Sequence, residues 1–273
     1  MKHQPAQRHA RQPRKLTRRR FLIGGAGIVG AGAVIGITTE HYLDRLDNRP
    51  VALVYRGPAS CAGCSEAVAH LLQTHPTPFR AVFCGPDEDT PLTAASLAKA
   101  VVYAQPGGGT LSPAWRKMRA HAHDLRTWVH GGGHYLGFCL GGYLAGSSPG
   151  FGLVPGGIGR YIDSDEATVH NTDDTVIPIR WRHQQRHMFF QDGPTFPDAT
   201  HTATTVLARY DNDLPAALVA TYGAGRVGVV GPHPEADLTW YTGIGLTNPD
   251  GIRYDLGHDL IAATIHRPAA TPS

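Results

Sequence analysis

The sequence predicts an α/β fold in which helices cover both faces of a parallel sheet and antiparallel strands are added in the C-terminal half. Three successive strand–helix units precede Cys139, and units of this kind build parallel sheets. Beyond Cys139 the segments become strand-like and are separated by short turns. The 33 glycines and 21 prolines suit a fold with many loops, and 273 residues are enough to bury a full core.

Each element of the first half is predicted from an apolar run or a helical pattern, with glycine or proline in the connections. Residues 56–60 (Arg-Gly-Pro-Ala-Ser) form the loop after the first strand. Residues 106–109 (Pro-Gly-Gly-Gly) end the third strand, and residues 131–133 (Gly-Gly-Gly) end the long helix before the fourth. The predicted elements are, in order, strand 51–55, helix 65–73, strand 79–83, helix 92–99, strand 101–105, helix 113–129 and strand 135–138.

The second half is predicted to pack antiparallel strands on the first sheet and not to form a separate domain. Residues 180–190 are predicted as one strand, on which Trp181, His183, Gln185, His187 and Phe189 would share a face. The other predicted elements are strands 204–209, 216–221 and 226–230, a turn at 222–225 and a closing helix at 254–266. The domain thus spans residues 51–268, with a tail at 269–273.

The formal net charge of +3 is produced by the N-terminus, because the first 20 residues hold eight Lys and Arg and no acidic residue. Without these eight, 17 basic residues stand against 22 acidic ones, a net charge of −5. This balance argues against nucleic-acid binding by the folded part.

Residues 1–37 have the organisation of an export signal. A basic start leads into residues 17–23 (Thr-Arg-Arg-Arg-Phe-Leu-Ile) and an uncharged stretch at 21–37. The pattern resembles a twin-arginine signal with Arg18 and Arg19 as the pair. We therefore predict export through the twin-arginine translocation machinery.

A membrane anchor is the alternative interpretation of residues 21–37, although 17 residues are at the short limit for crossing a bilayer. A small-residue cleavage site at 31–33 (Ala-Gly-Ala) falls inside the apolar stretch, so cleavage is left open. The protein is thus predicted to be extracellular, or attached to the membrane through residues 21–37. Residues 38–50 are polar and charged, as in a linker.

Cys139 lies in residues 135–144 (Tyr-Leu-Gly-Phe-Cys-Leu-Gly-Gly-Tyr-Leu), where an apolar strand gives way to a small-residue segment. This is the pattern of a nucleophile elbow, a sharp strand-to-helix turn that presents one reactive side chain. Gly137 and Gly141 flank the cysteine at positions where a strained turn tolerates little more than a hydrogen atom. We therefore predict that Cys139 is a nucleophile.

A nucleophilic thiol needs a base and donors for the charge that develops on the attacked carbonyl. His233 and Glu235 follow strand 226–230, at the carboxyl edge of the sheet, and Pro234 between them favours a carboxylate that orients the imidazole. Backbone N–H groups of Gly108 and Leu140 are the predicted oxyanion donors.

The order of these pieces resembles the class I glutamine amidotransferase-like superfamily, whose triad is Cys, His and Glu in that order along the chain. Within it, the chain resembles the domain at the N-terminus of some biotin-protein ligases. The resemblance implies a flavodoxin-like core, the triad Cys139, His233 and Glu235, and substrate contacts from Gly107, Tyr143, Gln191 and Asp192. It covers roughly residues 51–240 and is carried by residues 55–58, 105–109, 132–143, 190–194 and 231–235.

Cysteine-dependent acyl chemistry on a small-molecule or peptide amide, with water as the final acceptor, is the leading functional expectation. Ammonia transfer is not expected, because the chain has no synthetase partner domain. Biotin transfer is not expected either, because nothing in it resembles a ligase module or a biotin-binding loop. Two alternatives remain: a non-catalytic ligand-binding domain on the same fold, and a thiol–disulfide oxidoreductase that uses Cys61 and Cys64.

The remaining cysteines favour a disulfide. Cys61-Ala-Gly-Cys64 lies at a strand-to-helix junction, as in thioredoxin-like sites, where a helix N-terminus makes the first cysteine reactive. A structural bridge is the alternative in an exported protein, and Cys84 at the end of the second strand is a candidate partner for either cysteine. Free thiols and metal ligation also remain open. Any such bridge leaves Cys139 unpaired.

The 16 histidines show no spacing of a known zinc signature, although His183 and His187 would share a strand face. We expect them to be solvated or hydrogen-bonded, with His134 a polar residue at a strand edge. The sequence therefore predicts no metal and no cofactor.

Overall fold

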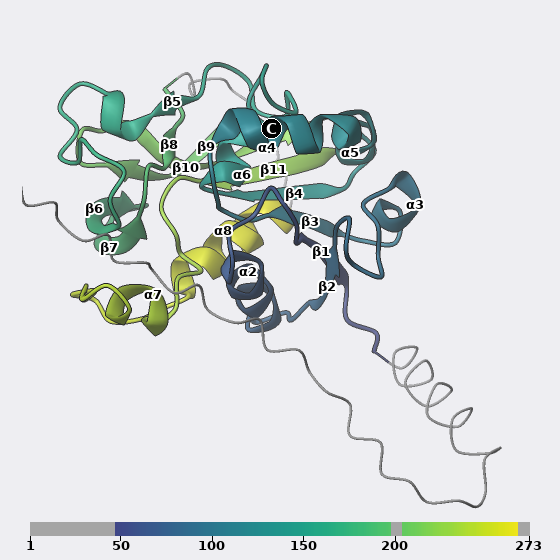
Figure 1. The fold of residues 1–273 in the computed structure, drawn as a ribbon, viewed down its shortest axis with the longest axis horizontal. Coiled ribbons are helices and arrows are strands. Elements are labelled where there is room, and N and C mark those ends of the chain that lie inside the picture. Colours follow the sequence, from purple (N-terminus) through teal and green to yellow (C-terminus); the bar gives the residue numbers. More distant parts are fainter. Residues whose placement is uncertain (1–46, 198–203, 267–273) are drawn as a thin grey trace, which may run out of the picture. The chain divides into compact units, whose positions relative to one another are not determined.

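The computed structural model describes residues 47–197 and 204–266. In this part a nine-stranded mixed sheet is covered by helices on both faces (Figure 1), which confirms the predicted fold class. The expected export signal, most of the expected linker and the expected tail lie outside the described residues. Within the described ranges, no helix is long and apolar enough to cross a membrane.

Five parallel strands form the first half of the sheet in the order β2-β1-β3-β4-β11. This is the 2-1-3-4-5 order of flavodoxin-like folds, in which ligands bind outside the carboxyl ends of the strands. The bounds are β1 Val51–Tyr55, β2 Arg80–Cys84, β3 Val102–Gln105, β4 His134–Phe138 and β11 Gly225–Val230.

The antiparallel strands continue the same sheet beyond β11 in the order β10-β9-β6-β7, as predicted for the second half. Their bounds are β10 Pro215–Tyr222, β9 Thr204–Tyr210, β6 Thr175–Trp181 and β7 Gln184–Phe190. A separate two-stranded sheet joins β5 Gly159–Arg160 to β8 Pro194–Thr195. The 3₁₀ helix η2 Tyr161–Asp163 follows β5.

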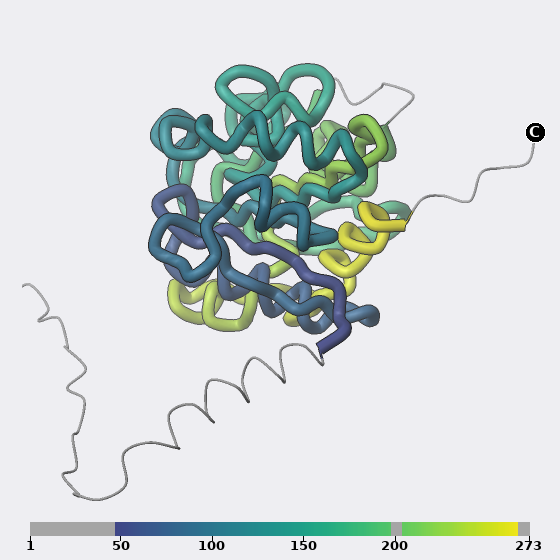
Figure 2. Tube along the Cα trace, turned by 90° about the vertical axis from the view of Figure 1, so that its right-hand side faces the viewer, coloured from purple at the N-terminus to yellow at the C-terminus, as the bar shows by residue number. Residues whose placement is uncertain are grey.

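Helices α2 Cys64–Gln73 and α8 Asp255–Ile265 pack on one face of the parallel strands. Their apolar stripes recur at helical spacing, as at Val68, Leu71 and Leu72 in α2, which explains why one face of each is buried. The opposite face is covered by α3 Ala94–Leu97, α4 Leu111–Met118, α5 Ala122–His130 and α6 Leu140–Ala145. Figure 2 shows these two helical layers, one on each side of the sheet.

The helix predicted at residues 113–129 is in fact two helices, α4 and α5, joined by the 3₁₀ turn η1 Arg119–His121. The apolar stripe runs through the junction, with Met118 and Ala122 both buried, so the hydrophobic pattern alone gives no sign of the break.

The single strand predicted at residues 180–190 is wrong, because the segment folds back as the hairpin β6–β7. Trp181 pairs with Gln184 across a two-residue turn, and Arg182 in the turn has a φ of 51°. Such turns usually contain asparagine or glycine, so Arg182 and His183 gave no turn signal. His183 therefore lies in the turn and does not share a strand face with His187.

Candidate active site

Cys139 lies at the junction of β4 and α6 with a φ of 46° and a ψ of −101°. Its N–H donates to the Val230 carbonyl at 2.9 Å, which ties the elbow to the end of β11. A Cβ atom on Gly137 would lie 2.5 Å from the Gly141 carbonyl oxygen, and one on Gly141 would overlap the Gln105 carbonyl oxygen. The two glycines are required because the backbone segments touch, and this contact holds the partly buried Cys139 at the end of the strand.

His233 and Glu235 follow β11 and form a buried pair, with His233 Nδ1 2.8 Å from Glu235 Oε1. The two residues are 4% and 0% exposed, so water does not screen the contact. The His233 backbone is held by donation from its N–H to the Phe189 carbonyl at 2.9 Å. The segment that carries His233 and Glu235 is thus anchored to β7.

Burial alone would lower the pKa of the His233 imidazole. The carboxylate of Glu235 and a side-chain hydrogen bond with Cys139 outweigh that effect, so the pKa is raised above its ordinary value. The two predicted partners, Glu235 and Cys139, thus both favour the protonated form of His233.

The glycine loop, residues 106–109, follows β3 and lies against both side chains. A Cβ atom on Gly107 would stand 2.8 Å from His233 Cε1 and 3.6 Å from the Cys139 Cβ. Gly108 has a φ of +131°, a conformation that favours glycine. Leu140 is the first residue of α6, so its N–H has no acceptor within the helix.

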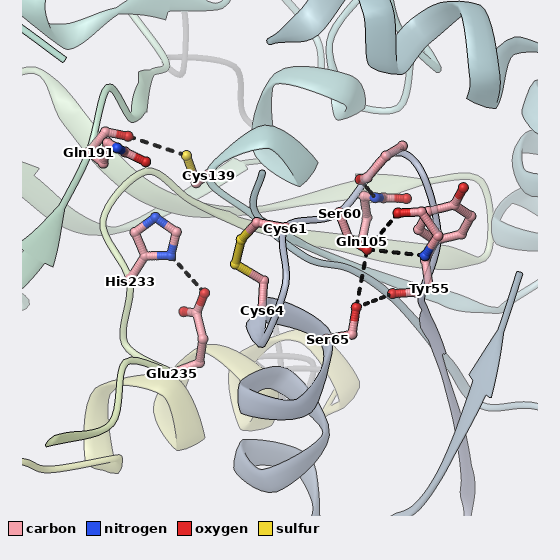
Figure 3. The surroundings of a disulfide bond; sticks show 12 residues. Tyr55, Ser60, Cys61, Cys64, Ser65, Gln105, Cys139, Gln191, His233 and Glu235 are labelled. Carbon is pink, nitrogen blue, oxygen red and sulfur yellow. Dashed lines mark hydrogen bonds and ion pairs between the residues drawn. A yellow bond between two sulfur atoms is a disulfide. The ribbon is translucent and has the colours of Figure 1, made fainter. Parts of the chain in front are cut away.

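A cavity of about 720 Å³ opens beside Cys139. Figure 3 shows the Cys139 sulfur, the His233 ring and the Cys61–Cys64 bridge grouped around one space. The lining of this cavity includes seven of the predicted site residues: Gly108, Cys139, Leu140, Tyr143, Gln191, Asp192 and His233. Cys61, Cys64, Arg160 and Trp240 also line it.

The loop after β7 approaches Cys139 through its backbone. The Cys139 thiol donates to the Gln191 carbonyl at 3.5 Å, and the Tyr143 hydroxyl donates to the Asp192 carbonyl at 3.2 Å. The Asp192 carboxylate binds Arg160. The contacts of Gln191 with Cys139 and of Asp192 with Tyr143 are thus made by backbone carbonyl oxygens.

Sequence reasoning missed Arg160 and Trp240. Arg160 lies in the two-residue strand β5, which has no motif, and Trp240 lies in the short helix α7 Leu238–Thr242. The Trp240 ring is 5.1 Å from the His233 ring between centroids and lies 5.2 Å from Phe189. The closeness of residue 240 to the His-Pro-Glu segment was the only available signal.

The disulfide joins Cys61 to Cys64, and Cys84 is buried and unpaired. Although β1 and β2 are neighbours, the Cys84 side chain packs in the core with Tyr55 and Tyr103, so the pairing of Cys84 with either cysteine is not formed. Burial raises the pKa of the Cys84 thiol to about 12. Cys139 therefore remains the free thiol at the cavity.

No group of three His, Cys, Asp or Glu side chains suited to a metal occurs in the described part of the chain. His134 begins β4, at the opposite end of the strand from Cys139, and burial lowers the pKa of its imidazole. It takes no part in this site.

The chain has the flavodoxin-type fold seen in glutamine amidotransferase-like proteins. The structure of PurLQS from Thermotoga maritima is similar with a TM-score of 0.50 and 16% sequence identity, covering 80% of this chain and 97% of that one. A protein from Thermoplasma acidophilum described as a "putative gmp synthase subunit a protein" gives a TM-score of 0.49 at 9% identity, covering 79% of this chain and 92% of that one.

Residues 51–154 match the family model "Biotin-protein ligase, N terminal". This range runs from β1 past the elbow and includes the CxxC segment, the glycine loop and Cys139. A search of curated proteins finds no match.

Proposed function

We propose that this protein is a cysteine-dependent hydrolase of amide bonds, with Cys139 as nucleophile, His233 as base and Glu235 as the residue that orients it. The observation that carries the proposal is the buried His233–Glu235 pair, 2.8 Å between Nδ1 and Oε1, whose imidazole lines the same cavity as the cysteine at the strained elbow. An elbow kept only as a fold feature would not need this pair. The glutamine amidotransferase-like fold supports the same class of chemistry by analogy.

In the proposed reaction, the proton of the Cys139 thiol lies on His233 when the Cys139 sulfur attacks the carbonyl carbon of the amide. The carbonyl π electrons move to oxygen, and the N–H groups of Gly108 and Leu140 bind the resulting oxyanion. When the tetrahedral intermediate collapses, the C–N bond breaks and His233 returns the proton to the leaving nitrogen. The product of this half is a thioester on Cys139 and a free amine.

Water then attacks the thioester carbonyl while His233 takes one of its protons. The C–S bond breaks, the carboxylic acid leaves, and the proton returns to the Cys139 sulfur. Glu235 stays hydrogen-bonded to His233 Nδ1 throughout and stabilises the imidazolium form of His233. The substrate is proposed to be a small-molecule or peptide amide held in the 720 Å³ cavity.

Export through the twin-arginine route is part of the proposal. It is supported by the Arg18-Arg19 pattern and by the Cys61–Cys64 disulfide, since such bridges persist mainly outside the reducing cytosol. Fusion of residues 1–37 to a reporter that folds in the cytoplasm tests it. Loss of export after Arg18→Lys with Arg19→Lys is the expected result, and unchanged export contradicts it.

Alkylation of the full chain with iodoacetamide near neutral pH, followed by peptide mapping, tests the catalytic proposal. Cys139 should be labelled selectively, and the rate of its alkylation should fall at least about tenfold in His233→Ala. His183→Ala is the matched control, because His183 lies in the β6–β7 turn. Cys84 is an internal control because its thiol is buried.

Equal and slow labelling of every thiol in wild type would rule the proposal out and favour a non-catalytic binding domain. Preferential labelling of Cys61 after mild reduction would favour a thiol–disulfide oxidoreductase instead. Hydrolysis of an amide library by wild type but not by Cys139→Ala would then identify the substrate class.

A further inference from the structure

We propose that Cys61 and Cys64 are positioning residues for the proposed reaction, and that their disulfide holds the glycine loop so that its N–H groups face the substrate carbonyl. The inference rests on the proposed function, because it concerns an oxyanion formed on an acyl group at Cys139. It gives a role to the CxxC segment, which the triad chemistry does not use.

The loop after β1 and the glycine loop touch along their backbones. The Cys61 N–H donates to the Gly107 carbonyl at 3.0 Å. A Cβ atom on Gly108 would overlap the Cys61 backbone nitrogen and would lie 2.7 Å from the Ser60 carbonyl carbon. With no side chain between the two segments, the glycine loop must follow any displacement of Cys61.

The other side of the glycine loop packs against His233 of the triad. Because a Cβ on Gly107 would stand only 2.8 Å from His233 Cε1, the peptide has little free space on this side either. The loop is therefore held between Cys61 and His233, and the direction of its N–H groups depends on the contact with Cys61.

The disulfide is the strongest tether of the Cys61 segment. Cys61 is exposed, whereas Cys64 is buried at the start of α2, so the bridge connects a surface residue to the packed helix. Hydrogen bonds also anchor the segment. Gln105 Nε2 donates to the Ala59 carbonyl at 2.8 Å and the Cys61 N–H donates to the Gly107 carbonyl at 3.0 Å. Weaker contacts run to the start of α2, from the Cys64 N–H to the Cys61 carbonyl and from Ser65 Oγ to Ser60 Oγ, both at 3.3 Å. Breaking the bridge restores conformational freedom to the loop.

Two reactions of Cys139 separate the oxyanion site from the nucleophile itself. Acetylation by p-nitrophenyl acetate passes through a tetrahedral oxyanion, whereas alkylation by iodoacetamide displaces iodide and forms none. Both are measured by mass spectrometry on the peptide that contains Cys139. The full chain is compared before and after reduction by a trialkylphosphine. The excess phosphine is removed under argon before p-nitrophenyl acetate or iodoacetamide is added. The phosphine takes oxygen from water and becomes the phosphine oxide, and the two sulfurs gain two electrons and two protons.

Reduction should slow acetylation of Cys139 about tenfold and change its alkylation less than about threefold. A double variant, Cys61→Ser with Cys64→Ser, should show the same slow acetylation without reductant and no further response to it. That variant also removes the thiols that reduction would otherwise expose to the reagents.

Unchanged acetylation after reduction overturns the proposal. Equal slowing of both reactions overturns it as well, because the loss would then lie in Cys139 and not in the oxyanion site. The proposed function is checked separately: a His233→Ala variant that acetylates Cys139 as fast as wild type would contradict the triad, whatever the effect of the disulfide.

Discussion

Arg160 binds both carboxylate oxygens of Asp192, with Nε 3.0 Å from Oδ1 and Nη2 2.9 Å from Oδ2, while the Asp192 backbone adopts a φ of 46°. A left-handed backbone is unfavourable for a residue with a Cβ atom. The bidentate pair holds the residue in that conformation, and the preceding Gln191 carbonyl then faces the Cys139 thiol. Asp192 is therefore a structural clamp of the loop that borders the nucleophile.

Substitution of Asp192 by glycine or by alanine tests the backbone part of this clamp. Both changes remove the carboxylate, but only alanine has to adopt the left-handed conformation with a Cβ. We expect the free energy of unfolding of Asp192→Ala to be about 1 kcal/mol lower than that of Asp192→Gly. Urea denaturation of the two variants measures the difference. Equal stability of the two variants would mean that the loop changes its conformation when the ion pair is lost.

Gly107→Ala should move the imidazole of His233. The added methyl group would stand 2.8 Å from Cε1, so the ring has to shift by a few tenths of an ångström or more. Because acid–base catalysis needs close contact with the thiol, alkylation of Cys139 should slow at least about tenfold. Gly131→Ala is the control, since its Cβ would meet nothing closer than 3.4 Å. Equal alkylation rates in the two variants would contradict the contact.

Much of this arrangement follows from short sequence patterns. The run from Tyr135 to Leu144 predicted an elbow, and the observed φ of 46° at Cys139 together with the close contacts of Gly137 and Gly141 accounts for the two glycines. His233 and Glu235 could be placed near Cys139 because they follow β11, Cys139 follows β4, and these two parallel strands end at the same edge of the sheet. Chain order was enough to bring these parts together.

The remaining features depend on contacts that no local pattern specifies. Arg160 reaches the site only because β5 pairs with β8, two strands of two residues each. The hairpin turn at Arg182 has no glycine or asparagine, and Trp240 reaches His233 through a short helix. The partner of Cys61 was likewise ambiguous, because strand order brings Cys84 to the same edge and only packing of Cys84 among the tyrosines excludes it.

Gly141→Ala should weaken the whole domain and not only the site. A Cβ at this position would overlap the Gln105 carbonyl oxygen, which belongs to β3 and cannot turn aside as a side chain could. We expect a loss of about 3 kcal/mol in the free energy of unfolding, against about 0.5 kcal/mol or less for Gly131→Ala. Thermal and urea unfolding measure both. A Gly141→Ala protein as stable as the Gly131→Ala control would mean that the elbow can open without cost.

Glu235→Gln should reverse the pH dependence that His233 gives to stability. In wild type the pKa of the folded-state imidazole is raised, so the folded chain holds a proton that the unfolded chain has lost above about pH 6.5. The contribution of His233 is complete below that pH, and it is lost as the pH rises toward the raised value. Without the carboxylate, burial, which is the largest single effect and lowers the pKa, is opposed only by Cys139. We therefore expect the pKa to fall and stability to rise with pH through the histidine range.

Urea unfolding between about pH 5 and 9 measures this reversal, whose slope for a single group is at most about 1.4 kcal/mol per pH unit. Glu66→Gln is the control, because Glu66 is an exposed partner of Arg56 and lies outside the triad. The second carboxylate oxygen, Glu235 Oε2, is buried without a hydrogen-bond partner among the described residues, so the amide of glutamine gives up no further contact there. Parallel pH profiles for wild type and Glu235→Gln would show that the carboxylate does not hold a proton on His233, and the base of the proposed triad would then lack its partner.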